Sequence, residues 1–184
     1  MSAFSDRYVN LTGEVQRSMA VDTSVIGKST GKWKIVIERG PVANFATSLK
    51  DSSPVYQSPE AAQGAGFDAI PVPVTYPFVM AHWGAFPELQ PPDGKIDGPS
   101  PVMQIIGTLM QKGGLVLHGE QEFTYHRPLV VGDVLLGEGK VVDAYEKDSK
   151  GKTMTFLVSE NTYVDEKTGE PVVSTRMNLI HRSA

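Results

Sequence analysis

The sequence predicts an α+β domain in which an antiparallel sheet is wrapped around one buried helix. Residues 74–86, "VTYPFVMAHWGAF", are apolar on nearly every side, and a helix without a polar face must be enclosed by other structure. From Leu115 onward, four strand-like runs are separated by short turns, which is the spacing of an antiparallel meander. The elements therefore follow an α+β order, in which one early strand and short helices come before the apolar helix and the long strands.

Composition excludes several functional classes. A chain of 184 residues suits one domain with a sizeable core. With 17 Lys and Arg against 21 Asp and Glu, the net charge is −4, so no basic surface for nucleic acid is expected. The chain has no Cys, which excludes disulfides, thiolate metal sites and Cys nucleophiles. Catalysis would have to come from carboxylates, His, Tyr or Ser/Thr.

The organisation of the chain indicates one domain behind a short extension. Residues 1–21 show only weak periodicity and are expected to precede the domain formed by residues 22–184. No apolar run approaches the roughly 20 residues that a membrane span needs. Residues 1–10 are too polar for the apolar core of a secretory signal. We therefore expect a cytoplasmic protein without a membrane partner.

The N-terminal half begins with a strand and a helix. Residues 32–38, "KWKIVIE", alternate apolar and polar side chains like a half-buried strand. Pro41 suits the first turn of a helix that ends near Asp51, with Phe45 and Leu49 on one face.

Three later segments also have helix signals. Ser58 is a candidate N-cap, followed by Pro59 at the first helical position. Thr75 is a candidate N-cap for the apolar segment. An amphipathic piece follows in residues 101–114, and its predicted apolar face consists of Met103, Ile106 and Met110.

The C-terminal half is expected to form four consecutive antiparallel strands around the apolar helix, the arrangement of a single hot-dog fold. Their ranges are residues 115–128, 133–147, 152–166 and 170–182. Alternation in the first of them predicts one polar face, made of His118, Glu120, Glu122, Thr124 and His126. The two His would lie about 26 Å apart and could not share an ion, so we expect a solvated face and no metal.

Several stretches together resemble the MaoC-like dehydratases. They are residues 51–56 with Asp51, Pro54 and Tyr56, the "PVPVTYP" entry to the apolar helix, and "HGEQEFTYHRPLVVGD". The resemblance is to the fatty-acid-synthase-type N-terminal dehydratase domain of actinobacterial (3R)-hydroxyacyl thioester dehydratases. It extends from about Val25 to the C-terminus, and "YHRPLVVGD" is its most specific part.

This resemblance implies hydration of a 2-enoyl thioester by an Asp and a His in a DxNPxH pattern. A His can take the α-proton because its ordinary pKa is about 6.5. Here Asp51 and Pro54 match the pattern, but Ser53 replaces the Asn and Tyr56 replaces the His. A phenol with a pKa near 10 is a poor base at neutral pH.

The helix entry departs from the family pattern as well. Catalytic members place a Gly there, whose backbone N–H polarises the thioester carbonyl. This chain has Val72, Pro73, Val74 and Thr75, and Pro73 has no N–H.

Together the two departures are typical of non-catalytic halves of two-part dehydratases. The resemblance therefore implies binding of an acyl-CoA or acyl-carrier-protein thioester, no cofactor, and a homodimer or a heterodimer with a hot-dog subunit that has DxNPxH. The predicted substrate-binding residues are Asp51, Pro54, Tyr56, Val74, Thr75 and His82.

Ordinary structural roles compete with these assignments. Asp51 could simply close a helix through a local hydrogen bond, Tyr56 could pack in the core, and His82 could be a core or interface residue. Phosphate contacts by Lys28, Lys32, Lys34 and Arg127 are a further expectation.

Three other functions stay open. One is an autonomous hydratase that uses Asp51 with Tyr56 or His82. Another is a hot-dog thioesterase. Such enzymes usually have a carboxylate on or beside the central helix to activate water, and residues 74–86 contain no Asp or Glu. The third is a non-enzymatic acyl-binding protein.

Overall fold

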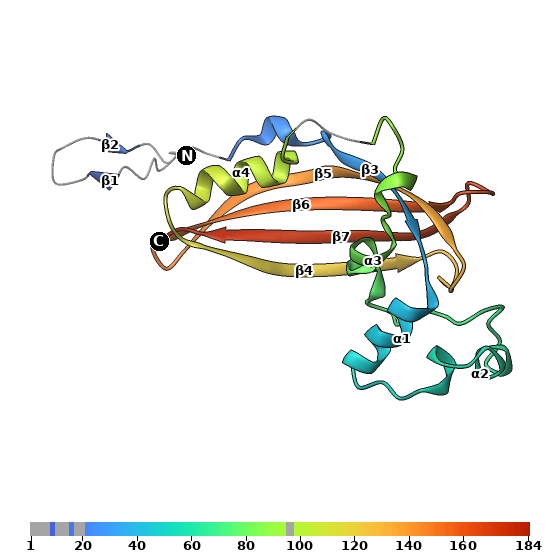
Figure 1. Cartoon of the computed structure of the whole chain (residues 1–184). Coiled ribbons are helices and arrows are strands. Elements are labelled where there is room, and N and C mark those ends of the chain that lie inside the picture. Colours follow the sequence, from blue (N-terminus) through green and yellow to red (C-terminus); the bar gives the residue numbers. More distant parts are fainter. Residues whose placement is uncertain (1–7, 10–14, 17–20, 95–97) are drawn as a thin grey trace.

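The computed structural model describes residues 8–9, 15–16, 21–94 and 98–184. Its main sheet has five strands in the order β3-β5-β6-β7-β4, all antiparallel (Figure 1). The strands are β3 (Ser29–Val36), β4 (Leu115–Tyr125), β5 (Val134–Ser149), β6 (Lys152–Asp165) and β7 (Pro171–Arg182). The predicted α+β class is confirmed.

Little of the expected extension, residues 1–21, lies within the described ranges. Strands β1 (Tyr8–Val9) and β2 (Val15–Gln16) form a small antiparallel ladder there. The division into an extension and a domain of residues 22–184 stays a prediction.

The predicted four-strand meander is wrong for its first strand. β5, β6 and β7 are consecutive neighbours, but β4 pairs with β7 at the far edge of the sheet. The connection between β4 and β5 passes the β6–β7 turn, where Arg127 donates to Asp133 at 2.8 Å and to Asp165 at 3.1 Å. This ion cluster binds the connection to the end of β6, so β4 and β5 lie on opposite sides of the β6–β7 pair.

The predicted polar face of β4 is also wrong, because the strand contains a bulge. The register shifts between His118 and Glu120, where Gly119 is the extra residue. Side chains alternate along a strand, so one extra residue turns all later side chains to the other face. His118 therefore lies on the face that packs against the helices, whereas Glu120 and Glu122 face outward.

The helices near the N-terminus follow the sequence signals closely. α1 (Arg39–Ser48) begins two residues before Pro41, and α2 (Pro59–Gly64) starts after Ser58, whose Oγ accepts from the Ala61 N–H at 3.3 Å. The predicted cap is confirmed. α1 buries Val42 and Ala46, so its buried face does not include Leu49, which is exposed.

The apolar segment is not one enclosed helix. It divides into a 3-10 turn, η3 (Tyr76–Phe78), and a short helix, α3 (Met80–Gly84). Gly84 lies flush on β3, because a Cβ there would approach Ile35 Cγ2 at 2.8 Å. One side of the segment is buried against the sheet, while Val74 is 70% exposed. The all-round apolar character reflects a surface that the described residues leave uncovered.

Helix α4 (Pro101–Met110) covers the other half of the same sheet face (Figure 1). Its N-cap is Ser100, whose Oγ accepts from the Met103 N–H at 3.3 Å. Val102 and Ile106 are buried, whereas Met103 and Met110 are exposed. The predicted face is wrong by about one residue, because the helix packs through Val102 rather than Met103. Within the described ranges, no helix combines the length and apolarity needed to cross a bilayer.

The Trp33 indole lies across two glycines of β5, which limits what can replace them. A Cβ at Gly137 would meet Trp33 Nε1 and lie 2.8 Å from Tyr163 Cε1, and one at Gly139 would meet Thr30 Oγ1 and lie 2.9 Å from Trp33 Cη2.

Gly137→Ala and Gly139→Ala are each expected to lower the free energy of unfolding by about 1–3 kcal/mol through overpacking. Gly107→Ala is the control, since a Cβ there meets nothing within 4 Å, and an Ala in a helix is favoured by about 1 kcal/mol. Chemical denaturation measures all three; equal stability of Gly107→Ala and Gly137→Ala would contradict the expectation.

Candidate functional site

Asp51 belongs to the turn that ends α1. Lys50 has φ 58°, its N–H donates to the Thr47 carbonyl at 2.9 Å, and the Asp51 N–H donates to the Ala46 carbonyl at 3.0 Å. These two bonds form a Schellman closure. The Asp51 carboxylate accepts from the Ser53 N–H at 3.0 Å, so one of its oxygens already stabilises the turn.

Tyr56 lies directly beyond this turn, in the 3-10 turn η2 (Pro54–Tyr56). Pro54 occupies the first position of η2, and the Tyr56 N–H donates to the Ser53 carbonyl at 3.3 Å. Burial, and then the negative charge of Asp51, raise the pKa of Tyr56 above its ordinary value. The phenol is therefore protonated at neutral pH and can donate a hydrogen bond, but it cannot act as a base.

Tyr125, at the end of β4, is a site residue that the sequence did not single out. Its hydroxyl donates to the Val74 carbonyl at 3.0 Å. Burial raises its pKa, and Tyr56 is the second cause, so the two phenols are close enough to interact. Its partner at residue 74 lies 51 residues away in the sequence, and no local pattern reports such a contact.

The entry to the apolar segment is fixed by backbone bonds. The Val72 N–H donates to the Leu129 carbonyl at 3.0 Å, and the Tyr76 N–H donates to the Pro73 carbonyl at 2.9 Å. Pro73 is buried and has no N–H. Thr75 is the N-cap residue of η3, as predicted, but its side chain makes no capping hydrogen bond. The Val72 and Tyr76 donors are therefore not available to a ligand carbonyl.

His82 lies on α3 and is exposed. Its backbone N–H donates to the Val79 carbonyl at 2.9 Å. A role as a core His is therefore excluded, and the interface role that the sequence also suggested stays open.

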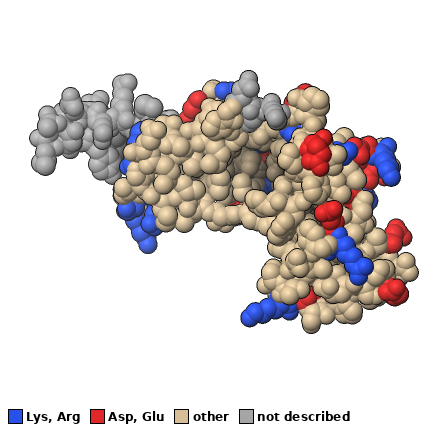
Figure 2. Space-filling model, in the orientation of Figure 1, with Lys and Arg blue, Asp and Glu red and all other residues tan. Residues whose placement is uncertain are grey.

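A hollow opens on the helix-covered face, between α4 and the segment that contains α3 (Figure 2). Strand register places Ser159, Asn161 and Thr175 on this face, between the apolar cluster under α4 and the one around Met80. Asn161 donates to the Thr175 hydroxyl at 3.4 Å. Hydroxyl and amide groups at this depth can bind a polar portion of a ligand.

Beside the hollow lies an exposed apolar patch, which we define as Val74, Phe78 and Trp83. Phe78 is 48% and Trp83 43% exposed. The Phe78 ring contacts the His118 ring edge-on with centroids 5.0 Å apart, so the patch adjoins β4. The described part of the chain leaves these three apolar side chains uncovered, and uncovered apolar surface is common at interaction sites.

The two edges of the sheet differ in how they are covered. At β3, the Gln90 side chain accepts from the Lys34 N–H at 3.1 Å and donates to the Lys34 carbonyl at 3.0 Å. The Lys32 N–H donates to the Gly94 carbonyl at 3.1 Å. Strand β4 pairs only with β7 among the described elements, so its outer edge is free to pair with another strand.

The expected phosphate contacts are not supported for three of the four basic residues. Lys32 pairs with Asp93 at 2.9 Å, and Lys34 pairs with Glu166 at 2.6 Å. Arg127 forms salt bridges with Asp133 and Asp165. Lys28 lines a groove of about 390 Å³ next to α4.

Buried phenols make the protein sensitive to alkaline pH. Burial is the main cause that raises the pKa of Tyr76 and of Tyr163, each to about 12. In the unfolded chain they ionise near pH 10, so their contribution to stability is complete below about pH 10 and is lost as the pH rises toward about 12.

Stability is therefore expected to fall in that window, and Tyr163→Phe should reduce the fall, because it removes one phenol that must ionise. Urea unfolding at stepped pH, with tyrosinate absorbance as a second probe, measures this. An identical pH dependence of the two proteins would contradict it.

A family model and curated relatives both match most of this chain. The model described as "FAS1-like, dehydratase domain region" matches residues 24–175. The "UPF0336 protein" of Saccharopolyspora erythraea is 29% identical over 167 residues, covering 89% of this chain and 93% of that protein. The "UPF0336 protein" of Thermobifida fusca is 29% identical over 146 residues, covering 79% of this chain and 83% of that protein.

Solved structures show the same fold. The ChsH1-ChsH2 complex from Mycobacterium tuberculosis contains a chain with a TM-score of 0.66 at 20% identity, covering 83% of each chain. The C-terminally truncated HadBC (3R-hydroxyacyl-ACP dehydratase) complex from the same organism contains a chain with a TM-score of 0.59 at 20% identity, and the match covers 87% of this chain and 99% of that one. With hot-dog neighbours of this kind and a family model that spans most of the sequence, the chain belongs to the FAS1-like dehydratase domain family.

Proposed function

We propose that this chain is the acyl-thioester-binding, non-catalytic subunit of a two-part (3R)-hydroxyacyl thioester dehydratase. A partner hot-dog subunit would supply the Asp and His of DxNPxH. The reaction would be reversible loss of water from a 3-hydroxyacyl thioester, with coenzyme A or a carrier protein as the acyl carrier.

The observation that supports this most strongly is that the phenol of Tyr56, at the position of the catalytic His, has a raised pKa. Removing an α-proton needs a base with a pKa near the working pH, and the pKa of this phenol is raised away from neutrality. Asp51, the other position of the dyad, has one oxygen engaged by the Ser53 N–H. The pair can donate and accept hydrogen bonds, which suits positioning of an acyl group.

A partner also accounts for two surfaces that this chain leaves uncovered. The apolar patch and the free edge of β4 adjoin each other through the Phe78–His118 contact. A second hot-dog unit that pairs along β4 would extend the sheet and cover the patch, and the thioester would enter between the units.

Two assays test the proposal. The isolated chain is expected to show negligible hydration of crotonyl-type and longer thioesters, and a DxNPxH subunit is expected to become active or more active when this chain is added. Titration with a non-hydrolysable acyl thioester measures binding separately. Robust turnover by the chain alone, abolished by Asp51→Asn, would establish the autonomous hydratase instead. Thioester binding without stimulation of a DxNPxH subunit would favour a non-enzymatic acyl-binding protein.

A further inference from the structure

The outward face of the edge strand β4 has two carboxylates that form no salt bridge within the described ranges. Glu120 and Glu122 are exposed and lie opposite Asn178 and Arg176 of β7. The salt bridges found in the described ranges do not include either Glu, nor Arg176. Among the described elements, β4 is the edge strand without such a cover, so these charges lie where a further strand could pair.

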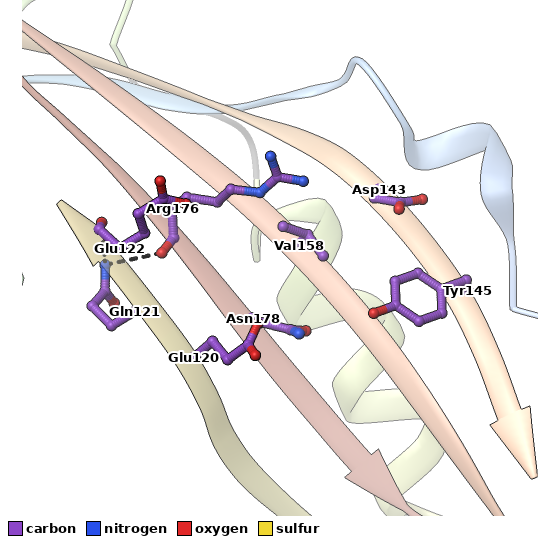
Figure 3. A pocket seen from close by; sticks show the side chains of 8 residues that line it. All are labelled: Glu120, Gln121, Glu122, Asp143, Tyr145, Val158, Arg176 and Asn178. Atoms are coloured by element: carbon purple, nitrogen blue, oxygen red, sulfur yellow. Dashed lines mark hydrogen bonds between the residues drawn. The ribbon is translucent and has the colours of Figure 1, made fainter. Parts of the chain in front are cut away.

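A groove of about 490 Å³ runs across the outward face and reaches this edge (Figure 3). It lies on the opposite side of the sheet from α4 and therefore differs from the Asp51–Tyr56 site. Its lining comes from four strands and consists of Glu120, Gln121, Glu122, Asp143, Tyr145, Val158, Arg176 and Asn178. Val158, on β6, is only 5% exposed, so the groove has an apolar floor between its polar side chains.

Two bulges determine which side chains reach the groove. β4 shifts register between His118 and Glu120, and β5 shifts between Val141 and Asp143. Without the extra residues, Glu120 and Asp143 would face the helices, because residues two apart share a face. Bulges commonly redirect side chains at functional surfaces, and here both direct a carboxylate outward.

The β4 end of the groove also contains an acceptor without a donor. Asn178 Oδ1 is buried and has no hydrogen-bond partner in the part of the chain that the structure describes. A donor-rich cationic side chain placed here would be attracted by the carboxylates and could satisfy this amide oxygen.

We propose that β4 pairs with an edge strand whose outward face has Lys or Arg next to Glu120 and Glu122. The inference rests on the proposed function for the kind of partner, a hot-dog subunit, and adds the charge that selects it. Such a cation would complete the groove at its open end.

The same surface disfavours a second copy of this chain. In an antiparallel β4–β4 pair centred on Glu120, Gln121 or Glu122, a carboxylate lies directly opposite another carboxylate. Like charges in that position destabilise strand pairing. Charged edges also protect sheets from aggregation, but that role alone would give no preference for a basic strand.

The test uses the full chain and a charge-reversed copy of itself as the basic strand. Self-association of the wild type, of Glu120→Gln/Glu122→Gln and of Glu120→Lys/Glu122→Lys is measured by sedimentation at low and moderate salt, together with an equimolar mixture of wild type and the Lys variant. Glu138→Gln/Glu170→Gln is the control, because it removes the same charge away from β4. Circular dichroism checks that each variant is folded.

We expect the mixture to associate at least about tenfold more tightly than either component alone, with the difference reduced by salt. The Gln variant should self-associate more tightly than the wild type, and the control should not. Slower amide exchange along β4 in the mixture would identify the edge. Equal association in all combinations, or none in any, overturns the proposal. Thioester binding is a separate readout, so its absence would count against the proposed function and not against the charge pairing.

Discussion

Tyr56→His is expected to leave the isolated chain without efficient hydratase activity. A base at position 56 would restore one part of the machinery, but Pro73 still provides no N–H for the thioester carbonyl. Loss of one such donor typically costs 100-fold to 1000-fold in rate. The Asp51 oxygen bound to the Ser53 N–H is a further obstacle. Turnover of a crotonyl-type thioester by the purified variant measures this. Strong activity would mean that the rest of the machinery is present.

Tyr56→Ala tests the binding role of the same residue. Loss of the ring should weaken binding of a non-hydrolysable acyl thioester by about 1–3 kcal/mol, while the intrinsic chemistry of a catalytic partner stays unchanged. Tyr56→Phe separates the ring from the hydroxyl. The matched control is Tyr145→Ala, which removes a partly exposed Tyr from the outward face of the sheet. Unchanged affinity for Tyr56→Ala would remove Tyr56 from the site.

The largest stability effect is expected for Tyr76→Ala. Tyr76 is 1% exposed and forms a cluster of three mutually contacting rings with Phe45 and Trp83, with centroids 5.5 Å from Phe45 and 6.1 Å from Trp83. It therefore connects α1 with α3. Truncation of a large buried aromatic residue typically costs about 3–5 kcal/mol, so the free energy of unfolding should fall by that amount.

Two controls separate the causes of this loss. Tyr76→Phe keeps the ring contacts and should cost much less than Tyr76→Ala. Val74→Ala removes a side chain that is 70% exposed and should change stability by no more than about 0.5 kcal/mol. Urea unfolding monitored by fluorescence compares the three. A Tyr76→Ala protein within about 1 kcal/mol of the wild type would show that the cluster repacks.

Local signals in the sequence predicted the local structure well. The alternation in "KWKIVIE" predicted the correct buried face, since Ile35 of β3 and Ile37 just beyond it are almost inaccessible. Ser58 and Pro59 marked the start of α2, because capping depends on neighbouring residues only. The assignment of Asp51, Pro54 and Tyr56 to a degenerate dyad also depends on a local pattern of six residues, and it stays a prediction.

The features that were mispredicted depend on distant partners. The pairing of β4 with β7 is itself a long-range contact that no periodicity reports. Gly119 in a strand was a signal for a bulge, but the sequence could not say that the polar face would be divided there. The apolar run at residues 74–86 was assigned to the interior because its uncovered side was not distinguishable from a core-facing one.

The Gln90 side chain has a consequence for how many chains can assemble. A sheet with two open edges can add further units at both ends and grow into a filament. Here the Gln90 amide occupies the N–H and the carbonyl of Lys34, so the β3 side cannot serve as a template there. Each chain then offers one growing end, and joining two such ends terminates growth. A single glutamine thus favours a closed pair over an open-ended polymer.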